Sequence, residues 1–127
     1  MSFILQDTAR EDNSLQLNAW HWKTILVMLE VAEVLPTEKL HLMGVSGACP
    51  TVSEEEVRSI ATGLREKVIP LFAVDDRIFI DGTVTKEPDD GTFHRGETEW
   101  HLNYSTNGAV LRELCSFCES CGPLVIC

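Results

Sequence analysis

Apolar residues follow helical spacing through the first part of the chain. They recur every three or four positions, at Leu15, Ala19, Trp22, Ile25, Leu26, Leu29 and Ala32. Asp12, Asn13 and Ser14 precede this stripe and offer side-chain oxygens that can cap a helix. Pro36 follows it and restricts the preceding residue to extended conformations. The pattern therefore predicts an amphipathic helix over residues 15–35.

Two tryptophans lie within this predicted helix, in the run Asn18-Ala-Trp-His-Trp22. Trp22 falls on the apolar stripe, which favours a place in the core. Trp20 and His21 lie to the sides of the stripe, and an exposed tryptophan is a common anchor at protein interfaces. We expect core packing for this cluster, with an interface as the alternative.

Two further helices are predicted from their capping residues. Ser53 and Glu56 have the spacing of a capping box, in which each side chain satisfies the other residue's backbone N–H. This helix ends at Pro70. A cluster of capping residues at 105–107 precedes the last helix, and the Gly-Pro pair at 122–123 marks its end.

Short β-prone runs separated by turn signals occupy the middle and the end of the chain. They are Arg77–Ile80, Thr83–Thr85, Thr92–His94, Trp100–Tyr104 and the apolar tail Leu124–Cys127. Asp81-Gly82 is a hairpin-type turn signal between the first two runs. We therefore predict a single α+β domain over residues 1–127, with about three helices packed on a small antiparallel sheet as one pair of layers.

The chain is acidic, and its acidity is concentrated in one segment. The 127 residues carry 20 Asp and Glu against 10 Lys and Arg, a net charge of −10. Residues 75–99 contain eight acids and three bases, so this segment carries a net charge of −5, half of the total. Phosphate repels such a surface, so nucleic acids and membranes are disfavoured as partners. A basic protein is favoured, although the charge can also serve solubility alone.

Nothing in the sequence predicts export or membrane insertion. The N-terminus lacks a basic start and a long apolar run, and no stretch approaches the ~18 consecutive apolar residues of a membrane span. Five cysteines is an odd number, and four of them lie between residues 115 and 127. A secreted disulfide framework would be spread more evenly, so we expect a reducing, cytoplasmic location.

The C-terminal cysteines are a candidate metal or redox site formed by Cys115, Cys118, Cys121 and Cys127. The predicted last helix argues against a shared metal, because Cys115 and Cys121 would lie ~9 Å apart along the helix axis. Zinc bonds each sulfur at ~2.3 Å and does not span that distance without unwinding the helix. The simpler interpretation is that some of these cysteines are small core residues and the others are surface thiols.

Evidence for an enzyme is weak, and we assign no catalytic residue and no cofactor. His94 and His101 are seven residues apart, with Glu97 and Glu99 between them, so they could converge across a hairpin as the site of a small hydrolase-like enzyme. The chain contains no phosphate-binding loop and no dinucleotide fingerprint. The acidic turn at 81–91 does not match a calcium-binding loop.

Three runs of residues resemble small uncharacterised bacterial proteins: Asn18–Trp22, Asp81–Thr85 with Pro88–Gly91, and the tail ending in Ile126-Cys127. In size and acidity, the chain also resembles bacterial immunity proteins. That second resemblance implies a cytoplasmic protein that binds and neutralises a cognate toxin, often a basic nuclease.

These observations favour a cytosolic binding protein, most concretely an immunity protein, over a metal or redox protein and over an enzyme. A basic protein such as a toxin domain is the expected partner. The contact residues that we predict are seven acids of the acidic segment and the tryptophan that follows it: Asp75, Asp76, Glu87, Asp89, Asp90, Glu97, Glu99 and Trp100.

Overall fold

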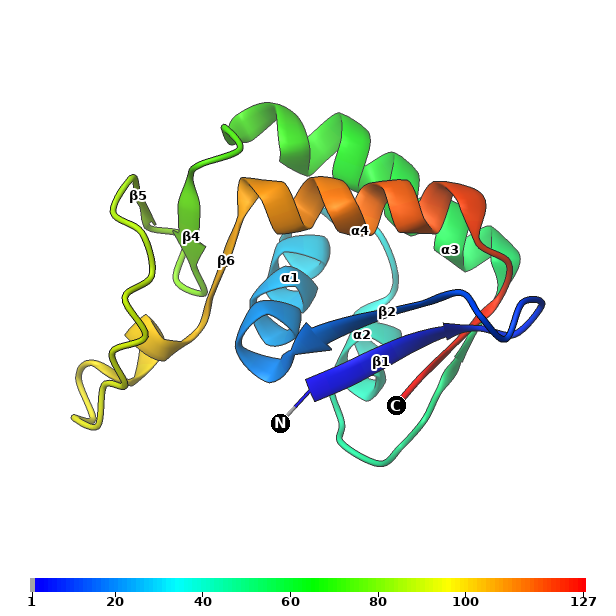
Figure 1. The fold of residues 1–127 in the computed structure, drawn as a ribbon, viewed down its shortest axis with the longest axis horizontal. Coiled ribbons are helices and arrows are strands. Elements are labelled where there is room, and N and C mark those ends of the chain that lie inside the picture. Colours follow the sequence, from blue (N-terminus) through cyan, green and yellow to red (C-terminus); the bar gives the residue numbers. More distant parts are fainter. Residues whose placement is uncertain (1) are drawn as a thin grey trace.

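The computed structural model describes residues 2–127 as four helices and two small antiparallel sheets, which confirms the α+β class (Figure 1). The larger sheet has the strand order β2-β1-β7-β3, formed by β1 (Ser2–Asp7), β2 (Ser14–Asn18), β7 (Leu124–Ile126) and β3 (Thr51–Val52). The smaller sheet has the order β5-β4-β6, formed by β4 (Arg77–Phe79), β5 (Val84–Thr85) and β6 (Ser105–Asn107).

The helices are α1 (Ala19–Val31), α2 (Thr37–Met43), α3 (Glu54–Gly63) and α4 (Gly108–Ser120). A π-helical turn at Leu64–Val68 (η1) and a 3₁₀ turn at Ile69–Leu71 (η2) extend α3, and a separate 3₁₀ turn covers Trp100–Asn103 (η3). The helices α3 and α4 pack side by side (Figure 1).

The caps predicted for α3 and α4 are present. Ser53 Oγ accepts from the backbone N–H of Glu56 at 3.1 Å, and the Glu56 carboxylate accepts from the backbone N–H of Ser53 at 2.9 Å. Asn107 caps α4 by accepting from the backbone N–H of Val110 at 2.8 Å. Both starts were predictable because a cap is a contact between near neighbours in the sequence.

The predicted start of the first helix is wrong by four residues. Residues 14–18 form strand β2, which pairs with β1 in a hairpin from Ser2 opposite Asn18 to Gln6 opposite Ser14. The helix begins at Ala19, where the Asn18 side chain accepts from the backbone N–H of His21 at 2.9 Å. Pairing with β1, which the helical pattern did not reveal, takes Leu15 and Leu17 out of the helix.

The apolar tail is docked as a strand, as predicted. Strand β7 lies between β1 and β3 and is antiparallel to both. Leu124 and Ile126 are buried, and the backbone of Cys127 exchanges hydrogen bonds with Ile4. The C-terminal end of the chain therefore completes the larger sheet.

The strands predicted at residues 92–94 and 100–104 are not formed. Residues 92–94 have no regular structure, and Trp100–Asn103 is the 3₁₀ turn η3. The side chain of Asn103 instead accepts from the backbone N–H of His94 and donates to its carbonyl, both at 2.7 Å. One amide side chain thus replaces a strand pair, and the third strand of the smaller sheet is β6, which pairs with β4.

One apolar core joins the helices to the larger sheet. Trp22 is 1% exposed, as its place on the apolar stripe predicts, and its indole N–H donates to the Met43 carbonyl at 2.9 Å. The Met43 carbonyl therefore satisfies the indole N–H of Trp22, which has the largest side chain in the core.

Candidate functional site

Four aromatic rings from two distant parts of the chain meet near the smaller sheet. We call the rings of Trp20, Phe93, Trp100 and Tyr104 the aromatic cluster. The centroids of Trp20 and Tyr104 are 4.8 Å apart at an interplanar angle of 73°, and those of Phe93 and Trp100 are 6.1 Å apart at 89°. Edge-to-face contacts of this kind favour one fixed arrangement of the rings.

Two rings of the aromatic cluster face solvent. Phe93 is 48% exposed and Trp100 is 47% exposed, whereas Trp20 and Tyr104 are partly buried. Trp20 also contacts both exposed rings, with centroid distances of 6.0 Å to Phe93 and 6.3 Å to Trp100. The start of α1 therefore supports the exposed rings, and the expectation that Trp20 packs in the core is not met, since its ring is only partly buried.

One lysine pairs with two of the predicted contact residues, Asp75 and Asp76. Lys86 Nζ lies 2.6 Å from Asp76 and 3.0 Å from Asp75. Asp76 is buried and also accepts from the backbone N–H of Ala73 at 2.8 Å. The hydrogen bond from Lys86 lowers the pKa of Asp76 below its ordinary value. Asp76 thus has a structural partner, and Asp75 remains exposed beside it.

Arg77 joins the smaller sheet to the loop that follows β5, residues 86–99, which we call the acidic loop. Its Nε donates to Ser105 Oγ at 3.0 Å, and its guanidinium lies 4.6 Å from the centroid of the Phe79 ring. The guanidinium also forms an ion pair with Asp89 at 3.7 Å. Because the Arg77 side chain is 17% exposed, this arginine is a largely buried link between β4, β6 and the loop.

The four remaining acids of the predicted contact set point to solvent: Glu87, Asp90, Glu97 and Glu99. Asp90 accepts from the backbone N–H of Thr92 at 2.9 Å, and hydrogen bonding by Thr92 lowers the pKa of the Asp90 carboxyl. Glu99 lies 3.8 Å from His94. Within residues 2–127, Glu87 and Glu97 form no ion pair, so their charges are available at the surface.

A cavity of about 480 Å³ opens between α1, β6 and the acidic loop, and His21 lines it. His21 Nδ1 is 3.0 Å from Thr106 Oγ1, a buried hydroxyl. Burial lowers the pKa of His21, which favours a neutral imidazole at neutral pH. The first backbone N–H groups of α4, at Gly108 and Ala109, donate to carbonyls of the chain and are not free to bind an anion.

The two histidines of the proposed enzyme site face different carboxylates. His94 Nδ1 lies 3.8 Å from Glu99, and His101 Nε2 lies 3.5 Å from Asp81 in the β4–β5 turn. The structure therefore forms two separate histidine–carboxylate pairs instead of one site in which both imidazoles share a carboxylate.

The cysteines fall into two groups. Cys115, Cys118 and Cys121 are buried free thiols, so the expectation of cysteines as core residues is confirmed for these three. The interaction between the Cys118 and Cys121 thiols raises the pKa of Cys118 and lowers that of Cys121. Cys115 Sγ instead donates to Glu119 at 3.2 Å. Among residues 2–127 no group of three or more His, Cys, Asp or Glu is placed to hold a metal.

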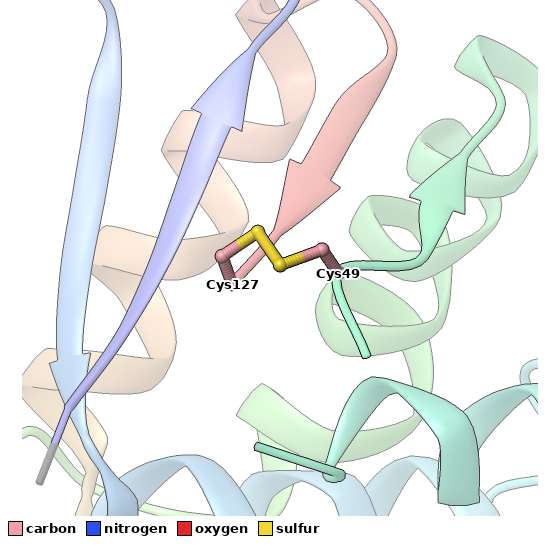
Figure 2. The surroundings of a disulfide bond; sticks show 2 residues. All are labelled: Cys49 and Cys127. Carbon is pink, nitrogen blue, oxygen red and sulfur yellow. A yellow bond between two sulfur atoms is a disulfide. The ribbon is translucent and has the colours of Figure 1, made fainter. Parts of the chain in front are cut away.

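Cys127 is covalently bonded to Cys49 and does not join the other C-terminal cysteines (Figure 2). The two Cα atoms are 4.4 Å apart across a sequence separation of 78. Both cysteines are exposed, and the bond links the end of β7 to the segment that precedes β3. The sequence pattern did not predict this pair, because Cys49 lies far from the cluster along the chain.

A second, apolar cavity of about 510 Å³ lies between α1, the η1–η2 segment and the β4–β5 hairpin. Val31 and Leu71 line it and are 79% and 70% exposed. Lys67 and Asp81 are the charged side chains at this cavity. It gives the molecule an exposed apolar surface that contains no member of the aromatic cluster.

Comparisons with protein families, with curated proteins and with solved structures found no match to this chain. Within residues 2–127, no helix is both long enough and apolar enough to cross a membrane.

Two of the four residues of the aromatic cluster were predicted from the sequence as interface residues. Trp100 was predicted as a contact residue and Trp20 as an interface candidate, whereas Phe93 and Tyr104 were assigned only to strands. The available signal was the density of aromatic residues between positions 93 and 104. That these rings meet Trp20 depends on packing of α1 against β6, which no local pattern reveals.

Proposed function

We propose that this chain is a binding protein whose partner is a basic protein, most concretely a bacterial toxin domain that it neutralises by direct contact. The observation that carries the proposal is the aromatic cluster, which presents two half-exposed rings, Phe93 in the acidic segment and Trp100 directly after it. Large aromatic side chains that stay exposed on a small protein are typical of interaction surfaces.

The chemistry of this surface matches the usual anatomy of an interface. Aromatic residues commonly form the energetic centre, and charged groups form a solvated rim. Here Phe93 and Trp100 would form the centre, with Glu97 and Glu99 close by in the sequence. The rim charges would speed the encounter with a basic partner more than they would strengthen the final complex.

The paired acids have a different part in this proposal. Asp75, Asp76 and Asp89 already interact with Lys86 or Arg77. Asp76 is buried, so breaking its pair with Lys86 would cost free energy, whereas the pairs of Asp75 and Asp89 are exposed and contribute less. These three residues would hold the loop in place while the other acids meet the partner. The proposed contact set is therefore centred on Trp100 and Phe93 and extends over Glu87, Asp90, Glu97 and Glu99.

A photo-crosslinking amino acid at position 100, in the cells that naturally contain this protein, tests the proposal. The control carries the same crosslinker at Val31, which is 79% exposed beside the apolar cavity. We expect a basic protein to crosslink at position 100 and not at position 31. With that protein purified, Trp100→Ala should weaken binding by at least about fivefold, the effect of losing an interface anchor worth about 1 kcal/mol. Equal crosslinking at both positions, or unchanged affinity, would contradict the proposal.

One observation favours a second candidate, a redox or metal-binding role for the C-terminal cysteines. The Cys118 and Cys121 thiols are both free and buried, and each shifts the pKa of the other, as in a dithiol that can be oxidised or can bind a soft metal. Elemental analysis of protein purified without chelator distinguishes the two functions. Stoichiometric zinc or iron that is lost in Cys118→Ser would favour the cysteine site over the binding surface.

A further inference from the structure

Arg95 is the one Lys or Arg among residues 87–104, and its guanidinium lies over an exposed aromatic ring. Its guanidinium carbon is 5.5 Å from the centroid of Phe93, within the range of a cation–π contact. Within residues 2–127, Arg95 forms no ion pair, although Glu97 and Glu99 are two and four residues away. The exposed face of the aromatic cluster thus already holds a guanidinium from its own chain.

We propose that Arg95 occupies the place of a partner's arginine and is displaced when the partner binds. This inference rests on the proposed binding function and adds the partner's chemistry and a self-inhibiting contact. The π face of an aromatic ring attracts cations, and the nearby carboxylates give this surface the complementary charge. The planar guanidinium of arginine stacks on an aromatic face better than the ammonium of lysine does.

Displacement of Arg95 requires little free energy. An exposed cation–π contact contributes about 0.5–1 kcal/mol, and Arg95 lies in a solvent-exposed loop with no ion pair to break. Once released, Arg95 can turn toward Glu97 or water. An arginine that belongs to a partner brings additional contacts and excludes water from the ring, so the exchange favours the complex.

The probe is an acetylated, amidated peptide of alternating glycine and arginine, with its glycine–lysine counterpart for comparison. Binding is followed by NMR through the indole N–H signals of the three tryptophans. We expect the signals of Trp100 and Trp20 to move. The signal of Trp22 should stay fixed as an internal reference, because its N–H is buried and bonded to Met43.

The decisive variant is Arg95→Ala, and its matched control is Arg10→Ala. Both remove one exposed positive charge, and Arg10 lies in the β1–β2 turn at the other end of the molecule (Figure 1). Arg95→Ala should bind the arginine peptide about two- to fivefold more tightly than Arg10→Ala does, the ratio that corresponds to removing one exposed cation–π competitor. In a Phe93→Leu background, Arg95→Ala should give no additional gain, because the shared ring is absent.

The outcomes separate this inference from the function on which it rests. If Trp100→Ala weakens peptide binding but Arg95→Ala and Arg10→Ala bind alike, the binding surface stands and the role of Arg95 is overturned. If Trp100→Ala binds as well as the unmodified protein, the proposed surface itself is wrong. Absence of binding, or equal affinity for the arginine and lysine peptides, overturns the guanidinium preference.

Discussion

The carboxylate of Asp7 accepts a hydrogen bond from the backbone N–H of Gly122 at 3.2 Å, across a sequence separation of 115 residues. The same carboxylate accepts from Asn13 Nδ2 at 2.9 Å and from the backbone N–H of Ala9 at 2.8 Å. Asp7 is 2% exposed and lies at the end of β1, and Gly122 connects α4 to β7. One acid therefore joins the β1–β2 turn to the segment that carries the C-terminal strand.

Asp7→Asn should destabilise the protein and alter its response to acid. The hydrogen bond from Asn13 lowers the pKa of Asp7 below its ordinary value of 3.8. The stability that Asp7 contributes is therefore complete above pH 3.8 and is lost as the pH falls below it. Urea unfolding as a function of pH should show a shallower acid loss in Asp7→Asn than in Asp12→Asn, an exposed acid in the same turn. Identical acid profiles would show that Asp7 has no such role.

Loss of the disulfide should lower the free energy of unfolding by about 4 kcal/mol, the loop-closure value for a bridge of this span. Cys127→Ser in non-reducing buffer measures this loss. Unmodified protein treated with a reductant should unfold at the same denaturant concentration as the variant. Titration of denatured, unreduced protein should detect the three free thiols of Cys115, Cys118 and Cys121, and five would contradict the pairing.

Gly108→Ala should destabilise the protein even though alanine is the better helix former. A Cβ at position 108 would lie 2.0 Å from the carbonyl oxygen of Ala73, so α4 could not approach that backbone. We expect a loss of about 1–3 kcal/mol, as for other overpacked sites. At Gly96, where a Cβ would lie 3.9 Å from Glu99, the same substitution should change the unfolding midpoint little. Equal midpoints for the two variants would refute this packing.

Protonation of His21 in mild acid should lower the free energy of unfolding. Burial lowers the pKa of this imidazole from its ordinary value of 6.5, so the unfolded chain takes up the proton at a higher pH than the folded protein does. Stability from the neutral imidazole is thus complete above pH 6.5 and declines as the pH falls below it. His21→Gln should remove this decline, and His41→Gln, at a side chain that is 70% exposed, should keep it. Thermal unfolding across this pH range measures both slopes.

Part of the candidate site could be predicted from local sequence patterns. The acidic segment and Trp100 could be identified in the sequence because charge and residue type are known without a structure. The sequence did not show which acids are free, because Lys86 pairs with Asp75 and Asp76 across the β4–β5 hairpin. The strand predictions at 92–94 and 100–104 failed for a related reason, because the Asn103 side chain satisfies the backbone that a strand partner would satisfy.

The sequence by itself determined the α+β class, the capping box at Ser53 and Glu56, the Asn107 cap and the strand character of the tail, because each depends on neighbouring residues or on periodicity. The tertiary structure alone decided that residues 14–18 form a strand, that Cys127 bonds to Cys49, and that Phe93 and Trp100 meet Trp20. Those contacts join parts of the chain whose approach depends on how all the helices and strands pack together, and no local preference specifies that packing.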